Sequence, residues 1–352
     1  MRRYAIVVLA LALTAVATAA GWSWQMGELT GDLTRVGGWP ERDFAPRQPA
    51  ETVTLAPSST GSVPDIVVVG DSFSLSGVWQ PATFGGERYA TYDIEHFCFA
   101  RYLESAQFRN APPRVVVVQT VERLYLHRFG GDAWCPRHSE QAVVAHPEHW
   151  KGYRASAPSG FAGIAPGFAL DALRASFREW RSPAVTRSGD STLTGLTQAS
   201  LFSNHRADRI LLCAGDEAKA TWSAQEVEQS VRNVRALGRR IEANGRTTFV
   251  FVLVPDKSTA YAPWLRVPTL ATDLHLGDRL AAAGVNAPRV DRAIADAVAT
   301  GMRDVYLPND THLSAGGFGL LATTLRHAIP QLAPQPAARA TDSTQFPSRR
   351  GS

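Results

Sequence analysis

The sequence predicts an α/β domain whose sheet is mainly parallel, doubly wound and covered by helices on both faces. Several short apolar runs are continuous rather than alternating, which is typical of strands buried on both sides. Segments with the helical spacing of apolar residues lie between and after these runs, so strands and helices alternate along the chain. With 352 residues, the chain is long enough to bury a large core.

Three segments are expected to form strands of this sheet. The first covers 65–69, and the second covers 114–120, where four valines follow one another. The third covers 247–254 and ends before Pro255, which has no N–H to continue the hydrogen-bonded ladder.

The clearest helix begins at Ser223, because Ser223 and Glu226 have the spacing of a capping box. It is expected to stop at Asn244-Gly245, a helix-ending pair. Further helices are expected at 170–180, 272–283, 291–300 and 314–327.

Other segments have weaker patterns. From about 126 to 215 prolines, histidines, serines and glycines interrupt any periodicity, so a long insertion is expected within a domain spanning 61–332. Residues 25–60 are expected to form an extended lead-in that packs on this domain. Residues 333–352 are rich in Ala, Pro, Ser and Thr and are expected to be a disordered tail.

The first 24 residues predict export. Arg2 and Arg3 precede an uncharged run at 5–20, and Ala17-Thr18-Ala19 fits a small-residue cleavage site. Extended through Trp24, the run reaches about 20 residues, the length of a membrane anchor. The segment is therefore either a cleaved signal peptide or a retained inner-membrane anchor. Both alternatives predict a periplasmic protein.

Charge and histidine placement exclude several classes of function. The net charge of +4 comes from the N-terminal arginines and the tail, and no basic stripe interleaved with aromatics is present, so nucleic acid is not an expected partner. His146 and His149 flank Pro147 and cannot share one helical face, so neither a metal site nor another cofactor is expected.

Three cysteines in an exported chain allow one disulfide and one remaining thiol. Cys98 and Cys135 are the expected pair, because both lie in segments that flank one strand. Alternatively, these two and Cys213 are all small buried residues.

Two short sequence motifs contain the residue types of a nucleophilic catalytic site. Gly70-Asp71-Ser72 follows the first strand, where a tight turn exposes a serine hydroxyl above the sheet. Asp310-Thr311-His312 lies at the start of the last helix, and an aspartate there can orient an imidazole. Ser72 is then the expected nucleophile, with His312 as base and Asp310 as its orienting acid. The alternative is that both strings only cap helices.

Together these strings resemble the SGNH/GDSL hydrolase superfamily, whose fold is flavodoxin-like. More narrowly, the chain is similar to the alginate O-acetyltransferase group of AlgX/AlgJ type over roughly 28–330. The further strings that carry this similarity are Glu122-Arg123-Leu124-Tyr125, Val254-Pro255-Asp256-Lys257 with Tyr261, and Leu29–Arg35 with Glu41–Phe44.

The order of these strings departs from the alginate group. There the Asp-x-His string precedes the serine string, whereas Ser72 comes first here, which implies a circular permutation within one fold. The superfamily's oxyanion asparagine has no clear counterpart, so Arg123 is expected to bind the oxyanion, or else to form a structural pair with Glu122. Lys257 and Tyr261, which follow the third strand at the same edge, are expected either to contact the substrate or to support the site.

The resemblance implies O-acetylation of an exported polysaccharide through an acetyl-serine. Its implied partners are the polysaccharide acceptor and a multipass membrane acyltransferase that delivers acetyl groups. Two alternatives remain: a carbohydrate O-acetylesterase with the same fold, and a catalytically silent polysaccharide-binding subunit of an export complex.

Overall fold

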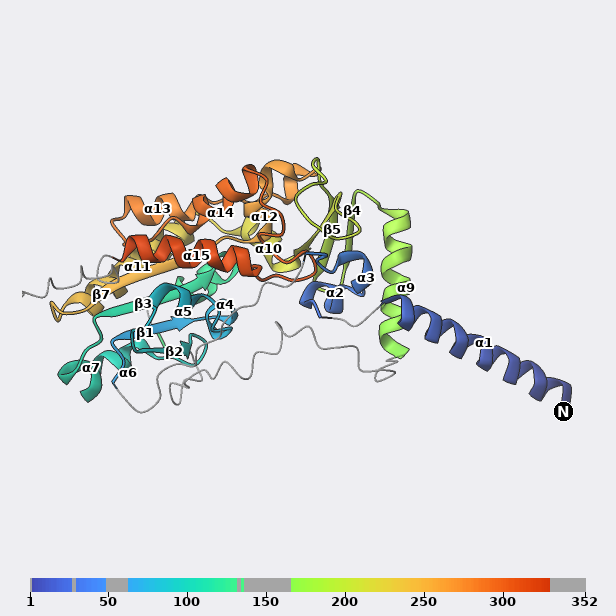
Figure 1. Ribbon diagram of the computed structural model, residues 1–352, viewed down its shortest axis with the longest axis horizontal. Coiled ribbons are helices and arrows are strands. Elements are labelled where there is room, and N and C mark those ends of the chain that lie inside the picture. The colour runs from blue at the N-terminus through green and yellow to red at the C-terminus, as the bar shows by residue number, and fades with distance from the viewer. Residues whose placement is uncertain (1, 27–29, 49–62, 132–133, 136–165, 330–352) are drawn as a thin grey trace, which may run out of the picture.

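The computed structural model describes residues 2–26, 30–48, 63–131, 134–135 and 166–329 (Figure 1). The tail expected at 333–352 lies outside the described residues, as do part of the lead-in and the middle of the expected insertion.

A parallel sheet of four strands forms the centre of the α/β domain. Its strands are β1 (Ile66–Gly70), β2 (Tyr89–Asp93), β3 (Val115–Val121) and β7 (Thr248–Val254). Their order is β2-β1-β3-β7, and every neighbouring pair is parallel. This order matches the first four strands of the flavodoxin-like sheet, in which ligands bind beyond the carboxyl ends of the first and third strands. The expected fold class is confirmed.

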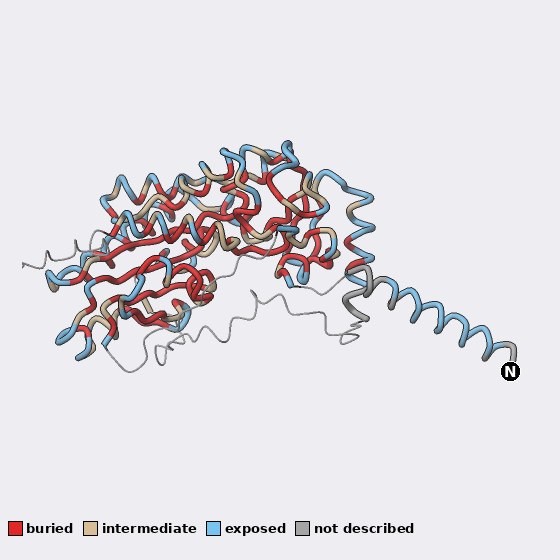
Figure 2. The backbone as a smooth tube through the Cα atoms, viewed as in Figure 1, coloured by how far each residue is buried: buried red, intermediate tan, exposed pale blue. Residues whose placement is uncertain are grey.

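Helices cover both faces of this sheet, which places its strands among the most buried parts of the chain (Figure 2). On one face, Val68 and its neighbours pack with α5 (Trp79–Phe84), α14 (Val290–Ala299) and α15 (Ala315–Ala328). On the other face, Val67 and its neighbours pack with side chains of α11 (Ala224–Glu242) and α13 (Leu276–Ala282). The other α-helices of the domain are α4 (Ser72–Leu75), α6 (Phe99–Glu104), α7 (Ala106–Asn110), α8 (Tyr125–Phe129), α10 (Ala214–Ala218) and α12 (Lys257–Ala260).

The described part of the expected insertion is more regular than its sequence pattern indicates. It contains α9 (Pro166–Arg181), which includes the helix expected at 170–180. It also contains an antiparallel sheet of β4 (Val185–Ser188), β5 (Ser191–Gly195) and β6 (Arg209–Cys213). Serines and threonines occupy buried positions of β5, so the sequence of this strand lacks the apolar run from which a buried strand can be predicted.

The lead-in is also more structured than expected. Instead of an extended segment it forms α2 (Asp32–Gly37) and α3 (Glu41–Phe44). Leu33, Trp39 and Phe44 are buried against the second sheet, which stabilises this helical arrangement. The expectation of an extended conformation was therefore wrong for its described residues.

The chain begins with helix α1 (Arg2–Met26), which projects from the rest of the molecule (Figure 1). Within the part of the chain that the structure describes, no helix has both the length and the apolar character to cross a membrane. The signal peptide and the anchor both remain predictions.

Candidate active site

The Gly-Asp-Ser turn is fixed by contacts that only these residue types allow. A Cβ atom at Gly70 would lie 2.4 Å from the Ser74 hydroxyl, so glycine is needed where β1 ends. Asp71 caps α4 by accepting a hydrogen bond from the Phe73 N–H at 3.1 Å. Its other carboxylate oxygen accepts from the Val121 N–H at 2.8 Å, which ties the turn to β3. Ser72 is thereby held at the first position of α4, beyond the carboxyl end of β1.

The histidine string lies against this serine. His312 Nε2 is 2.8 Å from Ser72 Oγ, and His312 Nδ1 is 2.6 Å from Asp310 Oδ1. The same Asp310 oxygen accepts from the His312 backbone N–H at 2.9 Å, which locks the carboxylate to the ring it faces. The structure therefore brings together the three residues that the two strings supply, in the order Asp310, His312, Ser72.

Electrostatics in the site favour an ionised aspartate beside the imidazole. Burial alone raises the pKa of Asp310, but the hydrogen bonds and charge of His312 outweigh it and bring that pKa to about 2. For His312, burial lowers the pKa, whereas the hydrogen bond and charge of Asp310 raise it by more, and the charge of Asp32 adds to the rise. A raised histidine pKa suits a ring that must accept a proton from serine.

Asp32 is a site residue that motif spacing did not identify. Its carboxylate accepts hydrogen bonds from the Thr311 N–H at 2.8 Å and the Thr311 hydroxyl at 2.5 Å. Its own N–H donates to Asp310 Oδ2 at 3.1 Å. Burial and the charge of Asp310 raise the pKa of Asp32. Its only sequence signal was its place in the lead-in string that resembles exported family members.

The lead-in holds the same loop at further points. The Asn309 carbonyl accepts from the N–H groups of Leu33 and Thr34, and the Asn309 side-chain amide donates to Glu41. A Cβ at Gly31 would lie 2.1 Å from the Asn309 carbonyl oxygen, so this close approach requires glycine. The first turn after the lead-in glycine therefore forms one wall of the site.

Lys257 supports the loop from the other side. Its Nζ donates to the carbonyl oxygens of Leu307 at 2.9 Å, Pro308 at 3.3 Å and Asp310 at 3.0 Å. The side chain is buried, and burial lowers its pKa to about 8 despite nearby carboxylates. Tyr261 is fully buried, and its hydroxyl accepts from the Tyr306 N–H. Of the two roles expected for these residues, substrate contact or support, their burial favours support.

Arg123 lies behind the catalytic residues in a buried ionic cluster. Its Nη1 donates to Asp256 at 2.8 Å and lies 3.8 Å from Asp216. Burial lowers the pKa of Arg123, but these two carboxylates raise it by more, so the guanidinium stays charged. The expected alternative pair with Glu122 does not form, because Glu122 binds Lys219 at 2.6 Å instead.

Arg123 nevertheless acts electrostatically on the site, because its positive charge lowers the pKa of His312. Among the described residues, only the Nη1 atom of this guanidinium has a hydrogen-bond acceptor. Its other N–H donors are thus unused within the described part of the protein, which is compatible with a role towards an oxyanion.

The ligand-type atoms of Asp32, Asp310 and His312 lie within 4.8 Å of one another, close enough to hold a metal ion. Each of these groups already has hydrogen-bond partners, however: Thr311 for Asp32, His312 for Asp310, and Ser72 and Asp310 for the imidazole. This donor set is arranged for proton transfer rather than for coordination. His146 and His149 lie outside the described residues.

The expected cysteine pair is joined in the structure. Cys98 and Cys135 form a disulfide with a Cα separation of 4.1 Å. Cys213 is a free, half-buried thiol whose pKa is raised by burial.

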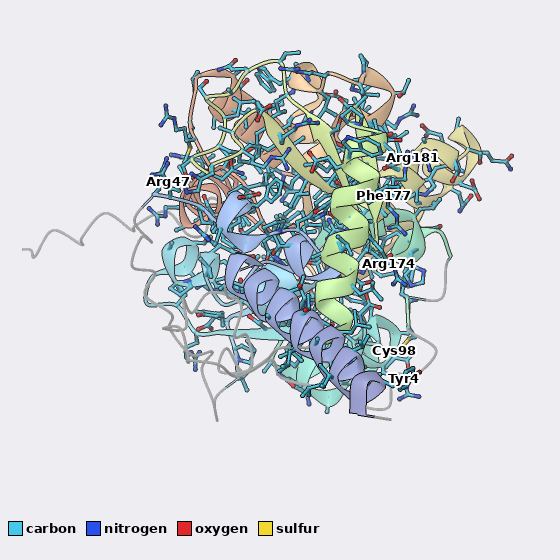
Figure 3. All side chains as sticks on the ribbon, turned by 90° about the vertical axis from the view of Figure 1, so that its right-hand side faces the viewer. Tyr4, Arg47, Cys98, Arg174, Phe177 and Arg181 are labelled. Atoms are coloured by element: carbon cyan, nitrogen blue, oxygen red, sulfur yellow. A yellow bond between two sulfur atoms is a disulfide. The ribbon has the colours of Figure 1, made fainter. Side chains whose placement is uncertain are left out.

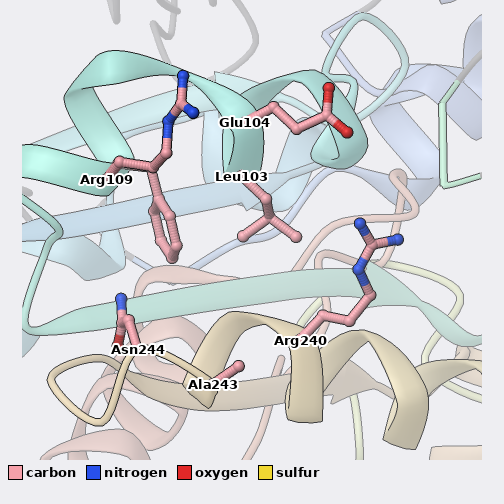
Figure 4. A pocket seen from close by; sticks show the side chains of 7 residues that line it. Leu103, Glu104, Arg109, Arg240, Ala243 and Asn244 are labelled. Atoms are coloured by element: carbon pink, nitrogen blue, oxygen red, sulfur yellow. The ribbon is translucent and has the colours of Figure 1, made fainter.

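Figure 4 shows a pocket that is separate from these residues. Residues of α6, α7 and the end of α11 line it, among them Phe108, Arg109 and Arg240. Because α7 precedes β3 and α11 precedes β7, this pocket is near the amino ends of the strands, away from Ser72.

Comparison with known protein families gives a match over part of the chain. Residues 210–351 match the family model of the SGNH hydrolase-like domain of the acetyltransferase AlgX. The matched segment contains Lys257, Asp310 and His312 and leaves out Ser72, as expected when the serine string stands first. No curated protein and no solved structure gives a significant match. Over residues 210–351 the chain is similar to the SGNH hydrolase-like domain of AlgX, the group that the motifs indicated.

Proposed function

We propose that this protein is an exported O-acetyltransferase that modifies a polysaccharide through an acetyl-Ser72 intermediate. The observation that carries the proposal is the continuous hydrogen-bonded series Asp310–His312–Ser72 at the carboxyl edge of the sheet. This arrangement supplies a nucleophile, a base and a group that orients the base.

In the first half-reaction, Ser72 Oγ attacks the acyl carbon of an acetyl donor while its proton passes to His312 Nε2. Asp310 stabilises the imidazolium that forms. The tetrahedral intermediate then collapses, the bond to the donor's leaving group breaks, and His312 returns its proton to that group. Acetyl-Ser72 and the released donor group remain.

In the second half-reaction, a sugar hydroxyl gives its proton to His312 Nε2 and attacks the acetyl-serine carbonyl. Collapse breaks the bond to Ser72 Oγ, which recovers the proton from His312. The products are an acetylated sugar and free enzyme. In both halves, the Ser72 N–H and the Arg123 guanidinium are the proposed donors to the oxyanion.

Two observations support the proposed class of substrate and the proposed cellular location. The family match to the AlgX domain favours acetyl transfer to a polysaccharide. The apolar N-terminal segment favours export to the periplasm, where a multipass membrane acyltransferase would deliver acetyl groups.

Transfer and hydrolysis can be separated with an activated acetyl ester as donor. We expect the acetyl-enzyme to release its acetyl group faster when an oligosaccharide is added, with acetylated sugar as the product. Release at the same rate without a sugar, and without acetylated sugar, would instead identify a carbohydrate O-acetylesterase with the same serine mechanism.

A further inference from the structure

Helix α9 carries an apolar stripe that the rest of the described protein leaves uncovered. Leu170, Leu173, Phe177 and Trp180 follow one another at steps of three and four residues, so they share one face of the helix. Their exposed fractions are 46%, 52%, 55% and 77%. The opposite face carries Ala172 and Ala175, which are almost fully buried and hold the helix on the domain.

Such exposure is unusual in this molecule. Outside α1, six large apolar side chains of the described residues are exposed, and four of them form this stripe. The rings of Phe177 and Trp180 lie 5.8 Å apart, so the two largest side chains form one continuous apolar surface. A concentration of exposed Leu, Phe and Trp on one helix indicates a binding surface.

Arginines follow one border of the stripe. Helical spacing places Arg174, Arg178 and Arg181 beside it, and all three are exposed (Figure 3 labels Arg174, Phe177 and Arg181). The guanidinium of Arg181 lies 6.0 Å from the centre of the Phe177 ring. Of the acidic residues on α9, Glu179 is on the inner side of the helix, where it pairs with Arg206, and Asp171 is exposed and pairs with Arg174 at 3.1 Å. The outward surface of α9 is thus apolar, with a border on which three arginines outnumber one aspartate.

We propose that α9 is an interfacial helix that binds the surface of a bilayer containing anionic lipids. Leu, Phe and Trp on one face with arginines at its border are the side chains that enter the headgroup region and contact lipid phosphates. The neighbouring helix α1 supports a lipid rather than a protein occupant. It ends beside α9 and exposes a series of large apolar side chains at the same end of the molecule (Figures 1 and 3).

Contact with a membrane through α9 would also place the catalytic residues near the bilayer. Helix α2 packs against α9 so closely that a Cβ at Gly38, the residue that ends α2, would lie 2.9 Å from the Asp171 backbone. At its other end α2 begins with Asp32, which binds Thr311 in the site. A single short helix therefore connects the proposed lipid surface to the catalytic loop.

The test is a fluorescent label at the edge of the stripe in the full-length chain. Ser176 is exposed and borders the stripe on the side away from the arginines. A Ser176→Cys, Cys213→Ala protein labelled with an environment-sensitive nitrobenzoxadiazole is mixed with phosphatidylglycerol vesicles or phosphatidylcholine vesicles. We expect a blue shift and a gain in emission with phosphatidylglycerol, and a much smaller change with phosphatidylcholine.

Two sets of variants make the result specific. Phe177→Ser with Trp180→Ser should reduce the vesicle affinity reported by the label more than about tenfold, because two aromatic side chains no longer enter the bilayer. Arg174→Gln with Arg181→Gln should reduce it by about tenfold or more. Arg235→Gln with Arg239→Gln removes the same charge from exposed positions of α11 and should leave the response unchanged.

Three outcomes would overturn the proposal. The label could stay unchanged while the protein sediments with vesicles, which would assign all binding to α1. The Arg174→Gln, Arg181→Gln protein could respond like its parent, which would exclude recognition of anionic lipid. The label could respond to protein concentration in the absence of lipid, which would assign the stripe to self-association.

Discussion

Replacing Asp32 by Asn tests whether the lead-in positions the catalytic histidine. The carboxylate accepts two hydrogen bonds from Thr311, whereas an amide offers only one oxygen and carries no charge, so at least one of the two charged hydrogen bonds is lost without an equal replacement. A hydrogen bond to a charged group contributes about 1.5–3 kcal/mol. If that energy aligns His312, the rate constant for acylation of Ser72 should fall about 10- to 150-fold.

The pH dependence gives Asp32→Asn a second, independent signature. His312 accepts a proton only when it is neutral, so acylation rises with pH as His312 loses its proton. Asp32 raises the pKa of His312, so its removal should move this rise to lower pH. Because the pKa of Asp32 is itself raised, its ionised form opposes folding at neutral pH, so removal of the charge should offset part of the stability that is lost with the hydrogen bond.

The assay is the burst of p-nitrophenol from p-nitrophenyl acetate, measured across pH by stopped flow. Thr311→Val removes one hydrogen bond but keeps the Asp32 charge, so the rate should fall without a shift of the pH profile. Asp43→Asn removes a charge from the same segment at α3 and serves as the matched control. A wild-type burst rate and pH profile in Asp32→Asn would refute the positioning role.

Three further predictions concern Arg123, Lys257 and the disulfide. Arg123→Ala should lower the acylation rate about 10²–10³-fold if Arg123 binds the oxyanion. A fall in Tm with an unchanged rate would instead show that Arg123 has only a structural role. Lys257→Met leaves three loop carbonyls without their charged donor and should lower the free energy of unfolding in urea titrations by at least the cost of one unpaired buried acceptor, about 1–3 kcal/mol; an unchanged urea midpoint would contradict this support. The Cys98–Cys135 disulfide closes a separation of 37 residues and should contribute about 4 kcal/mol. Thiol titration of unfolded, unreduced protein should find one free thiol, and three would exclude the bridge.

The sequence predicted the elements whose burial is uniform. β1, β3 and β7 are buried on both faces and therefore read as continuous apolar runs, which located them to within a residue or two. β2 is an edge strand with the sequence Tyr-Ala-Thr-Tyr-Asp, and β5 buries threonines and serines, so neither has such a run. Their strand structure depends on tertiary pairing that local pattern does not encode.

In the site, too, some residues could be predicted from local sequence and others depend on tertiary contacts. Ser72, Asp310 and His312 occur in short strings whose local geometry is set by neighbouring residues, so motif reading could find them. Asp32 acts through contacts with the Asp310 carboxylate and with Thr311, which are 278 and 279 positions from it in sequence. That contact exists only because the lead-in forms a helix against the catalytic loop, which its composition did not predict. Burial likewise decided that Lys257 supports the loop.

The most direct test of the central claim is to identify the residue that carries the acetyl group. The protein is incubated with p-nitrophenyl acetate, quenched in acid and analysed by intact mass and peptide mapping. The account predicts one acetyl group on Ser72, none in Ser72→Ala, and formation slowed by orders of magnitude in His312→Ala, since an unassisted serine hydroxyl is a weak nucleophile. An adduct that forms at the wild-type rate in Ser72→Ala, or that maps to another residue, would contradict it.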